Sequence, residues 1–472
     1  MKKNKVCIRF CVFLLISFFS ACTTTQKIEK GEGIVDGHEV AVESEEEIFS
    51  LSDFLDTLYV SLRNNGLEKT LGLFDTLPEE AEGDFTIEYL HASLLFSAND
   101  YDAAAEIANR LAVENPNNAD VMYLRAMIAK GQGKLTEKNA LLKQMIAEDP
   151  TNPEANVELA NDQMLRKNFG LAKRYFQTSL SSDPTNPDAM LGLGQSAYYT
   201  GDLKMSKDIL TRMTEIYPEE SMGWFFLAKL AGEEENYKKA GDYIETALSI
   251  EPDYYDYWSD YGIYLRYQGR SDEAEKAWSR AIDLNDEAFY AYIHRASLYD
   301  EKEDLDKALL DYIKIIELNP DYPYSYESLG MIYWHKEEWA KSRNAFNYAY
   351  KLNPANISYP LMISATYLRE KNTKANKDFL KNVYGKFPAD SIEYAMARLY
   401  YDGINPPLVE KKLTSITSSF LKGKMHFYMG LFYDLYGDDI NAKKQYLIVK
   451  NLQSPMFFEY RLNEWILAKM NG

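Results

Sequence analysis

Apolar residues recur along most of this chain at spacings of three and four, which is the spacing of one face of an α-helix. The helical stretches come in pairs with a period of 34 residues, and prolines mark that period. Eight of the 16 prolines share one position of the repeat, where chance would place about one half of one proline. They are Pro116, Pro150, Pro184, Pro218, Pro252, Pro320, Pro354 and Pro388, and Asp286 stands in the one skipped position. Because proline clashes with a continuing helical turn, each second helix is predicted to stop there.

The residues within each period also repeat. The fourth residue is bulky, the eighth and twentieth are small, and the eleventh and twenty-fourth are large and often aromatic. In residues 255–288 these positions hold Trp258, Gly262, Leu265, Ala274 and Trp278. Small residues let two antiparallel helices approach closely, and the large residues fill the space between them. Each period therefore predicts a helical hairpin.

This pattern resembles the tetratricopeptide-repeat family over most of the chain. The resemblance implies an all-α fold, a right-handed superhelical solenoid of stacked hairpins. Nine units in phase span residues 85–390, preceded by a degenerate capping repeat over 51–84. Residues 391–456 hold an irregular unit and a final repeat, and residues 457–472 are predicted to form a capping helix.

The first residues have the layout of a secretory signal: a basic start, an apolar run from Phe10 to Phe19, and then small residues. Phe19-Ser20-Ala21-Cys22 resembles the lipobox of bacterial lipoproteins, although that family usually has Leu where Phe19 stands. We expect residues 1–21 to be a cleaved signal peptide and Cys22 to be lipidated. An uncleaved membrane anchor is the alternative. Residues 22–50 are polar and acidic and are predicted to form a disordered tether after the lipid.

The charge and the reactive residues exclude several classes of function. The formal net charge of −20 disfavours nucleic-acid binding. Two of the three cysteines lie in the predicted signal, so the exported chain would keep only one and form no internal disulfide. The five histidines lack the spacing of metal ligands. We therefore expect no catalytic residues, no metal and no cofactor, and the chain is predicted not to be an enzyme.

In the family, the second, fifth, ninth, twelfth and thirteenth residues of each unit line a concave groove. In this chain those positions hold seven aromatic residues that the core pattern does not require. They are Tyr198, Tyr199, Phe225, Tyr267, Tyr290, Tyr324 and Trp334. Aromatic groups in a groove are typical of peptide recognition. The alternative interpretation is that the curvature of the array buries some of them against neighbouring first helices.

The C-terminal stretch resembles a narrower group. Residues 424–430 and 457–461 are similar to the end of the NlpI family of outer-membrane repeat lipoproteins, which act as adaptors for envelope enzymes. The resemblance covers only about 50 residues, and much of it follows the repeat pattern.

The leading hypothesis is a lipid-anchored scaffold of the bacterial envelope, attached to the outer membrane and facing the periplasm. It would bind envelope proteins or peptides through the aromatic groove and contact the membrane only through its lipid. A homo-oligomer is compatible with this hypothesis. The alternative is a solute-binding or accessory lipoprotein of a transporter.

Overall fold

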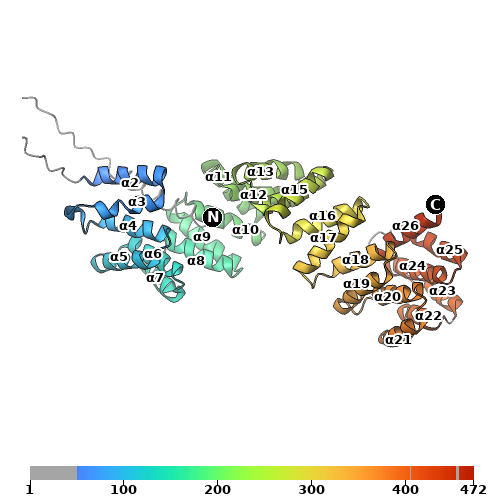
Figure 1. The fold of residues 1–472 in the computed structure, drawn as a ribbon. Helices are drawn as coiled ribbons and strands as arrows, with labels where there is room; N and C mark the ends of the chain where they lie inside the picture. The colour runs from blue at the N-terminus through green and yellow to red at the C-terminus, as the bar shows by residue number, and fades with distance from the viewer. Residues whose placement is uncertain (1–49, 404, 453–456, 472) are drawn as a thin grey trace, which may run out of the picture. The chain divides into compact units, whose positions relative to one another are not determined.

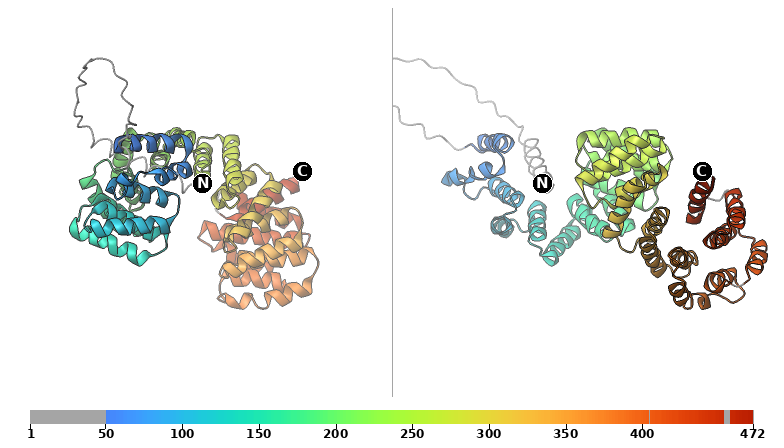
Figure 2. Two further views of the ribbon diagram at one scale, coloured as in Figure 1. Left: turned by 60° about the vertical axis from the view of Figure 1, so that its left-hand side comes forward. Right: turned by 45° about the vertical axis from the view of Figure 1, so that its right-hand side comes forward.

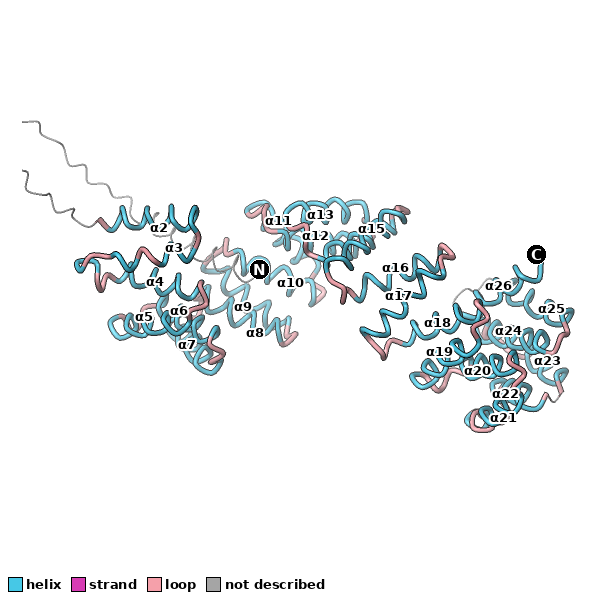
Figure 3. Tube along the Cα trace, in the orientation of Figure 1, coloured by secondary structure: helices cyan, strands magenta, loops and turns pink. Residues whose placement is uncertain are grey.

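The computed structural model describes residues 50–403, 405–452 and 457–471, and in these ranges every regular element is a helix (Figure 1 and Figure 3). The expectations for the signal, for Cys22 and for most of the tether fall outside the described residues. The chain divides into two compact units, the first ending at Pro218 and the second beginning at Glu219.

The first unit consists of helical hairpins after a shorter N-terminal segment. Its helices are α2 (Leu51–Asn65), α3 (Leu67–Leu71), η1 (Phe74–Thr76), η2 (Glu79–Ala81), α4 (Phe85–Ser97), α5 (Tyr101–Glu114), α6 (Ala119–Gly131), α7 (Leu135–Glu148), α8 (Pro153–Leu165), α9 (Phe169–Ser182), α10 (Pro187–Tyr199) and α11 (Leu203–Ile216). Each hairpin packs mainly on its neighbours in the sequence.

The second unit continues with hairpins of the same size. They are α12 (Ser221–Glu233), α13 (Tyr237–Ile250), α14 (Tyr255–Tyr267), α15 (Ser271–Leu284), α16 (Phe289–Glu301), α17 (Leu305–Leu318), α18 (Pro323–His335) and α19 (Trp339–Leu352). The remaining helices are less regular. They are α20 (Ser358–Arg369), α21 (Thr373–Leu380), η3 (Tyr384–Lys386), α22 (Ile392–Asp402), α23 (Pro406–Thr414), α24 (Ser419–Leu435), α25 (Asp439–Asn451) and α26 (Phe458–Asn471).

The hairpin of α14 and α15 shows why the sequence pattern gives this fold. The indole of Trp278 is fully buried and donates a hydrogen bond to the carbonyl oxygen of Ser259 at 3.0 Å. A Cβ at Gly262 would lie 2.4 Å from Nε1 of Trp278, so a larger residue there would force the two helices apart. Ala274 is also fully buried. The small residues therefore set the distance between the helices, as the pattern predicted.

The turn within each hairpin contains one residue with a positive φ. Glycine occupies it in several hairpins, as in Gly201 and Gly269 with φ of 76° and 78°. In two other hairpins this residue is a glutamate: Glu303 and Glu337 have φ of 58° and 59°. A residue with a Cβ in this left-handed conformation costs about 1 kcal/mol. The two glutamates are therefore placed at some cost to backbone stability.

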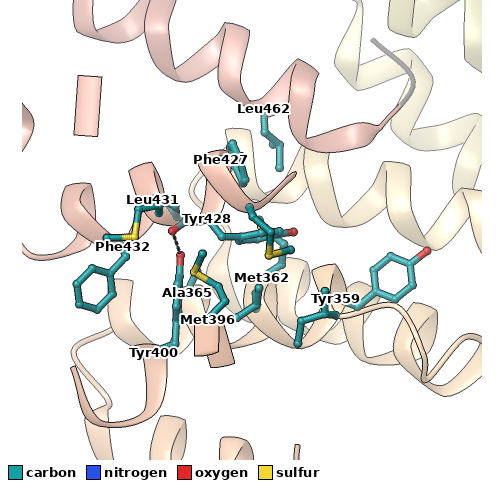
Figure 4. Packing of buried hydrophobic residues seen from close by; sticks show 14 of the residues in the cluster. Tyr359, Met362, Ala365, Met396, Tyr400, Phe427, Tyr428, Leu431, Phe432 and Leu462 are labelled. Atoms are coloured by element: carbon teal, nitrogen blue, oxygen red, sulfur yellow. Dashed lines mark hydrogen bonds between the residues drawn. The ribbon is translucent and has the colours of Figure 1, made fainter. Parts of the chain in front are cut away.

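The last helix of the chain returns to an earlier part of the second unit. Helix α26 packs against α24 and α25 and also against α18, which lies far earlier in the sequence. The right-hand view of Figure 2 shows this helix, in dark red, inside the arc of the brown and red helices. The core of this region holds the aromatic and aliphatic side chains drawn in Figure 4, including Tyr400, whose hydroxyl donates to the carbonyl oxygen of Tyr428 at 2.7 Å.

Candidate functional site

The seven aromatic residues predicted to line the groove differ in exposure. Four are open to solvent: Tyr290 is 70% exposed, Tyr267 and Tyr324 are each 65% exposed, and Tyr199 is 51% exposed. Tyr198 is half-buried. Phe225 and Trp334 are 8% and 5% exposed and belong to the core. Only some of the positions predicted from the repeat therefore carry an exposed aromatic side chain.

From the sequence we expected that the core pattern does not require Phe225 and Trp334. Their burial shows that this expectation was wrong for these two residues. The ring of Phe225 lies 4.8 Å from that of Tyr257 in the next first helix. Trp334 packs edge-on against Trp339 at 4.9 Å, and the guanidinium of Arg369 lies over its ring at 5.8 Å. These contacts come from the size of neighbouring side chains, which the position within the repeat does not specify.

The structure brings Tyr290 and Tyr324 together. Phe289 lies 5.5 Å from Tyr290 and 5.5 Å from Tyr322, and Tyr322 lies 5.6 Å from Tyr324, all between ring centroids and all edge-on. These four residues form a continuous aromatic surface at the beginnings of α16 and α18, which we call the tyrosine platform. Trp334, at the other end of α18, is not part of it.

Two other exposed tyrosines lie at the ends of first helices, each stacked on the first residue of the preceding helix. Tyr267 stacks on Tyr237 of the preceding hairpin at 4.3 Å with an interplanar angle of 8°. Tyr199 stacks on Phe169 at 4.6 Å with an angle of 23°. The stacking fixes each ring while leaving one of its faces toward solvent.

Ion pairs join successive first helices of the second unit. Lys229 pairs with Asp260 at 3.0 Å, and Arg266 pairs with Glu301. Each pair joins one repeat to the next. These charged side chains are therefore engaged in contacts within the chain. The exposed tyrosines remain as the larger accessible surface.

Helix α26 occupies the inner side of the hairpins around α16 and α18. Arg461 pairs with Asp300 at 2.8 Å, and the indole of Trp465 donates to Glu303 at 3.1 Å. Lys469 pairs with Glu337. Two of these carboxylates belong to Glu303 and Glu337, the turn residues with a left-handed backbone conformation. These two glutamates therefore bind the C-terminal helix, although their backbone conformation lowers stability. The sequence predicted a capping helix here but not these partners.

A buried polar cluster lies where α26 meets α18, α20 and α24. The hydroxyl of Tyr359 donates to Glu327 at 2.9 Å, and that of Tyr428 donates to Glu459 at 2.9 Å. Lys424 lies 3.8 Å from Glu459. The second carboxylate oxygen of Glu459 is buried without a hydrogen-bond partner among the described residues. Burial, together with the negative charge of Glu459, raises the pKa of Glu327 from 4.5 to about 7.

Four histidines lie in the described residues. One of them, His335, lies against Trp465 at 4.6 Å, and the other three also make packing contacts or a buried hydrogen bond. His91 stacks on Phe74 at 4.2 Å, His294 stacks on Trp278 at 5.6 Å, and His426 shares a hydrogen bond with Gln445 at 2.7 Å. Burial lowers the pKa of each of these three imidazoles, which favours the neutral ring. Within the described ranges, no three histidine, cysteine or acidic side chains gather as a metal site would require. No helix of the same ranges is long and apolar enough to cross a membrane.

Sequence profiles described as tetratricopeptide repeats match residues 89–153, 188–220, 223–254 and 260–323. Together with the observed hairpins, these matches confirm the predicted all-α array of stacked tetratricopeptide repeats. Proteins of this kind are scaffolds for protein–protein interaction and are generally not catalytic.

Two curated proteins are similar over part of the chain. A TPR repeat-containing protein of Methanocaldococcus jannaschii is 31% identical over 119 residues, which are 25% of this chain and 20% of that protein. A DnaJ homolog subfamily C member 7 homolog of Dictyostelium discoideum is 25% identical over 222 residues, which are 46% of this chain and 37% of that protein. The chain thus spans well under half the length of either relative.

Solved structures of similar fold are shorter than this chain. YrrB, described as a TPR protein with an unusual peptide-binding site, is 18% identical and covers 42% of this chain and 97% of its own, with a TM-score of 0.34. PilF of Pseudomonas aeruginosa is 19% identical and covers 46% of this chain and 97% of its own, with a TM-score of 0.36. These likenesses concern the fold alone.

Proposed function

We propose that this chain, an array of tetratricopeptide repeats, is a lipid-anchored scaffold that binds envelope proteins through exposed aromatic residues of its repeats. The observation that carries the binding role is the tyrosine platform. Tyr290 and Tyr324 expose 70% and 65% of their surface and are joined into one patch by Phe289 and Tyr322. Exposed aromatic rings held in place by their neighbours are typical anchors of protein interfaces.

Substitution of the two exposed tyrosines tests the binding role. Truncation of an exposed side chain usually changes stability by about 0.5 kcal/mol or less. Truncation of an interface anchor typically weakens binding by about 2 kcal/mol or more. We therefore expect the variant carrying Tyr290→Ala and Tyr324→Ala to melt as the parent does but to lose its partners after cross-linking in native membranes. Tyr348→Ala, at an exposed tyrosine of the second helix α19, is the control.

A lowered melting temperature with the partners retained would contradict this role for the platform. It would mean that the two tyrosines stabilise the hairpins and that the partners bind another face. Loss of partners in the Tyr348→Ala control as well would show that the effect is not specific to the platform.

The anchor is proposed from the sequence around Cys22. Acyl chains contribute about 0.8 kcal/mol for each buried methylene, and two or more chains give stable attachment to a membrane. Cys22→Ser should abolish fatty-acid labelling and release the chain from the membrane fraction. Unchanged labelling in this variant would exclude the lipid anchor and, with it, the proposed attachment to the outer membrane.

A further inference from the structure

The tyrosine platform offers exposed aromatic rings that are set edge-on to one another. Its two outer rings, Tyr290 and Tyr324, are largely exposed, while Phe289 and Tyr322 are partly buried and hold them in position. The ring contacts at 5.5, 5.5 and 5.6 Å make the surface continuous. A ligand that fits it must present groups able to pack against aromatic rings.

The phenol groups of the platform also lie near one another. Burial raises the pKa of Tyr322, and the neighbouring phenols of Tyr324 and Tyr290 raise it further. A phenol hydroxyl is a hydrogen-bond donor as well as an acceptor, so the platform offers several donors. A ligand that presents several free carbonyl oxygens would use these donors.

The rim of the platform is acidic. Asp286 and Glu287 precede α16, and Asp321 precedes α18 by two residues; all three are exposed. Within the described residues none of these three forms an ion pair, in contrast to Asp253 in the preceding loop, which pairs with Arg280 at 3.2 Å. Positive charge on a ligand is therefore favoured at this rim.

The same features of the platform indicate the backbone conformation of the ligand. A helix satisfies its carbonyl groups internally and would leave the phenol donors unused. An added β-strand needs an exposed sheet edge, and the described residues contain no sheet. A polyproline II segment has no internal hydrogen bonds, keeps its carbonyl oxygens free, and presents proline rings that pack on aromatic side chains.

We propose that the tyrosine platform binds a basic, proline-rich segment of a partner protein in the polyproline II conformation. This inference rests on the proposed scaffold function and names the chemistry of the partner. Prolines three residues apart lie on one side of such a segment, about 9 Å from each other. They pack on the rings of Tyr290 and Tyr324, the phenols donate to the carbonyl oxygens between them, and lysine or arginine side chains meet Asp286 and Asp321.

Binding of synthetic peptides to the full chain tests the proposal. The probe is fluorescein-labelled Pro-Pro-Lys repeated four times, titrated at about 50 mM salt and followed by fluorescence anisotropy. Two matched peptides replace either every proline by alanine or every lysine by glutamine. We expect the parent peptide to bind at least tenfold more tightly than either matched peptide, because each lacks one of the two recognised features.

Variants of the platform separate the roles of ring and hydroxyl. The double variant with Tyr290→Ala and Tyr324→Ala should lose at least tenfold in affinity for the Pro-Pro-Lys peptide. The double variant with Tyr290→Phe and Tyr324→Phe keeps the rings and should show a smaller loss. Tyr348→Ala should bind as the parent does, and circular dichroism should show that all variants remain helical.

Equal affinity for the proline and alanine peptides, or an unchanged affinity in the double alanine variant, would overturn the proposal. A result of this kind, combined with loss of cellular partners in the same double variant, would leave the scaffold function in place and exclude only the proline-rich partner. If neither the peptide nor any cellular protein depends on the two tyrosines, both the inference and the proposed use of the platform are wrong.

Discussion

The first unit and the C-terminal part of the second unit are built from the same kind of hairpin but differ in how far their contacts reach. In the first unit, the main contacts of the helices from α4 to α11 are with helices adjacent or next to adjacent in sequence. In the second unit, α26 contacts α18, and α20 contacts α24. Local contacts leave the array open along its length. The returning terminal helix packs on α18, α24 and α25, and we expect these contacts to make the last hairpins unfold together.

The largest expected effect comes from removing a buried side chain of α26. Leu462 is fully buried, and truncation of such a residue to alanine costs about 2–5 kcal/mol. Leu462→Ala should increase hydrogen exchange in α26 and also in α18, because the two helices pack together. Leu210→Ala, at a fully buried residue of α11, should cost a similar amount but increase exchange only in α10, α11 and adjacent hairpins of the first unit. Similar spreading in both variants would contradict the comparison.

Overpacking of a regular hairpin should have the next largest effect. A Cβ at Gly262 would meet the indole of Trp278 at 2.4 Å. Gly262→Ala is therefore expected to lower the free energy of unfolding by about 1–3 kcal/mol in thermal or urea denaturation. Gly170 has nothing within 4 Å of an added Cβ, so Gly170→Ala in the first unit is the control and should not destabilise the chain. Equal losses in both variants would mean that helix approach at Gly262 is not limiting.

The closed region should also be sensitive to pH. Burial raises the pKa of Glu327 from 4.5 to about 7, and burial raises that of Asp300 from 3.8 to about 6. Groups with a raised pKa hold their proton more tightly in the folded chain, so their contribution to stability is full below the unfolded pKa and is lost as pH rises through the folded value. The contribution of these two carboxyls to the protection of α26 should therefore fall as pH rises from about 4.5 to 7. His335, which lies 4.6 Å from Trp465 and whose pKa is lowered by burial, contributes in the opposite direction.

Glu327→Gln isolates this effect. It keeps a hydrogen-bond acceptor for Tyr359 and removes a negative charge near Glu459 and Lys424. The variant should lose less α26 protection between pH 4.5 and 7 than the parent does, after correction for intrinsic exchange rates. Glu464→Gln, on the exposed side of α26, should behave as the parent does. An identical pH profile for Glu327→Gln and the parent would show that this carboxyl does not control the docking of α26.

The smallest expected effect concerns the left-handed turn residues. Lys167, in the first unit, has a φ of 58°, and its replacement by glycine should stabilise the chain by up to about 1 kcal/mol. Glu303 has the same φ but binds Arg461 and Trp465 of α26. Glu303→Gly should therefore show a smaller gain or a net loss in urea denaturation. Equal gains at both positions would mean that the contacts with α26 contribute nothing measurable.

The hairpins could be predicted from the sequence because their contacts are local and repeat every 34 residues. Gly262 and Trp278 lie at fixed positions of one unit, so their packing follows from the period. The contact of Arg461 with Asp300 is different: it depends on small rotations accumulated over several repeats, which the period does not encode. The spacing of Arg461, Trp465 and Lys469 by four residues on one helix was the available signal for a docked face.

The candidate site was predictable only in part, for a related reason. The register placed Tyr290 and Tyr324 at the same position of successive units, and both are exposed. It placed Trp334 in the same groove, yet Trp339 and Arg369 bury its ring. The position of a residue within the repeat fixes where its Cα lies. The size of the neighbouring side chains decides whether its own side chain remains accessible. The joining residues Phe289 and Tyr322 lie outside the groove positions and were not singled out from the sequence.

Site-specific photo-cross-linking in cells tests most directly whether the tyrosine platform binds partners while α26 stays on its own chain. A benzophenone amino acid would replace Tyr324 in one sample, Trp465 in a second and the exposed Tyr348 in a third. The account predicts adducts with other proteins from position 324, adducts within the chain from position 465, and few adducts from position 348. Adducts with other proteins from position 465, with none from position 324, would contradict it.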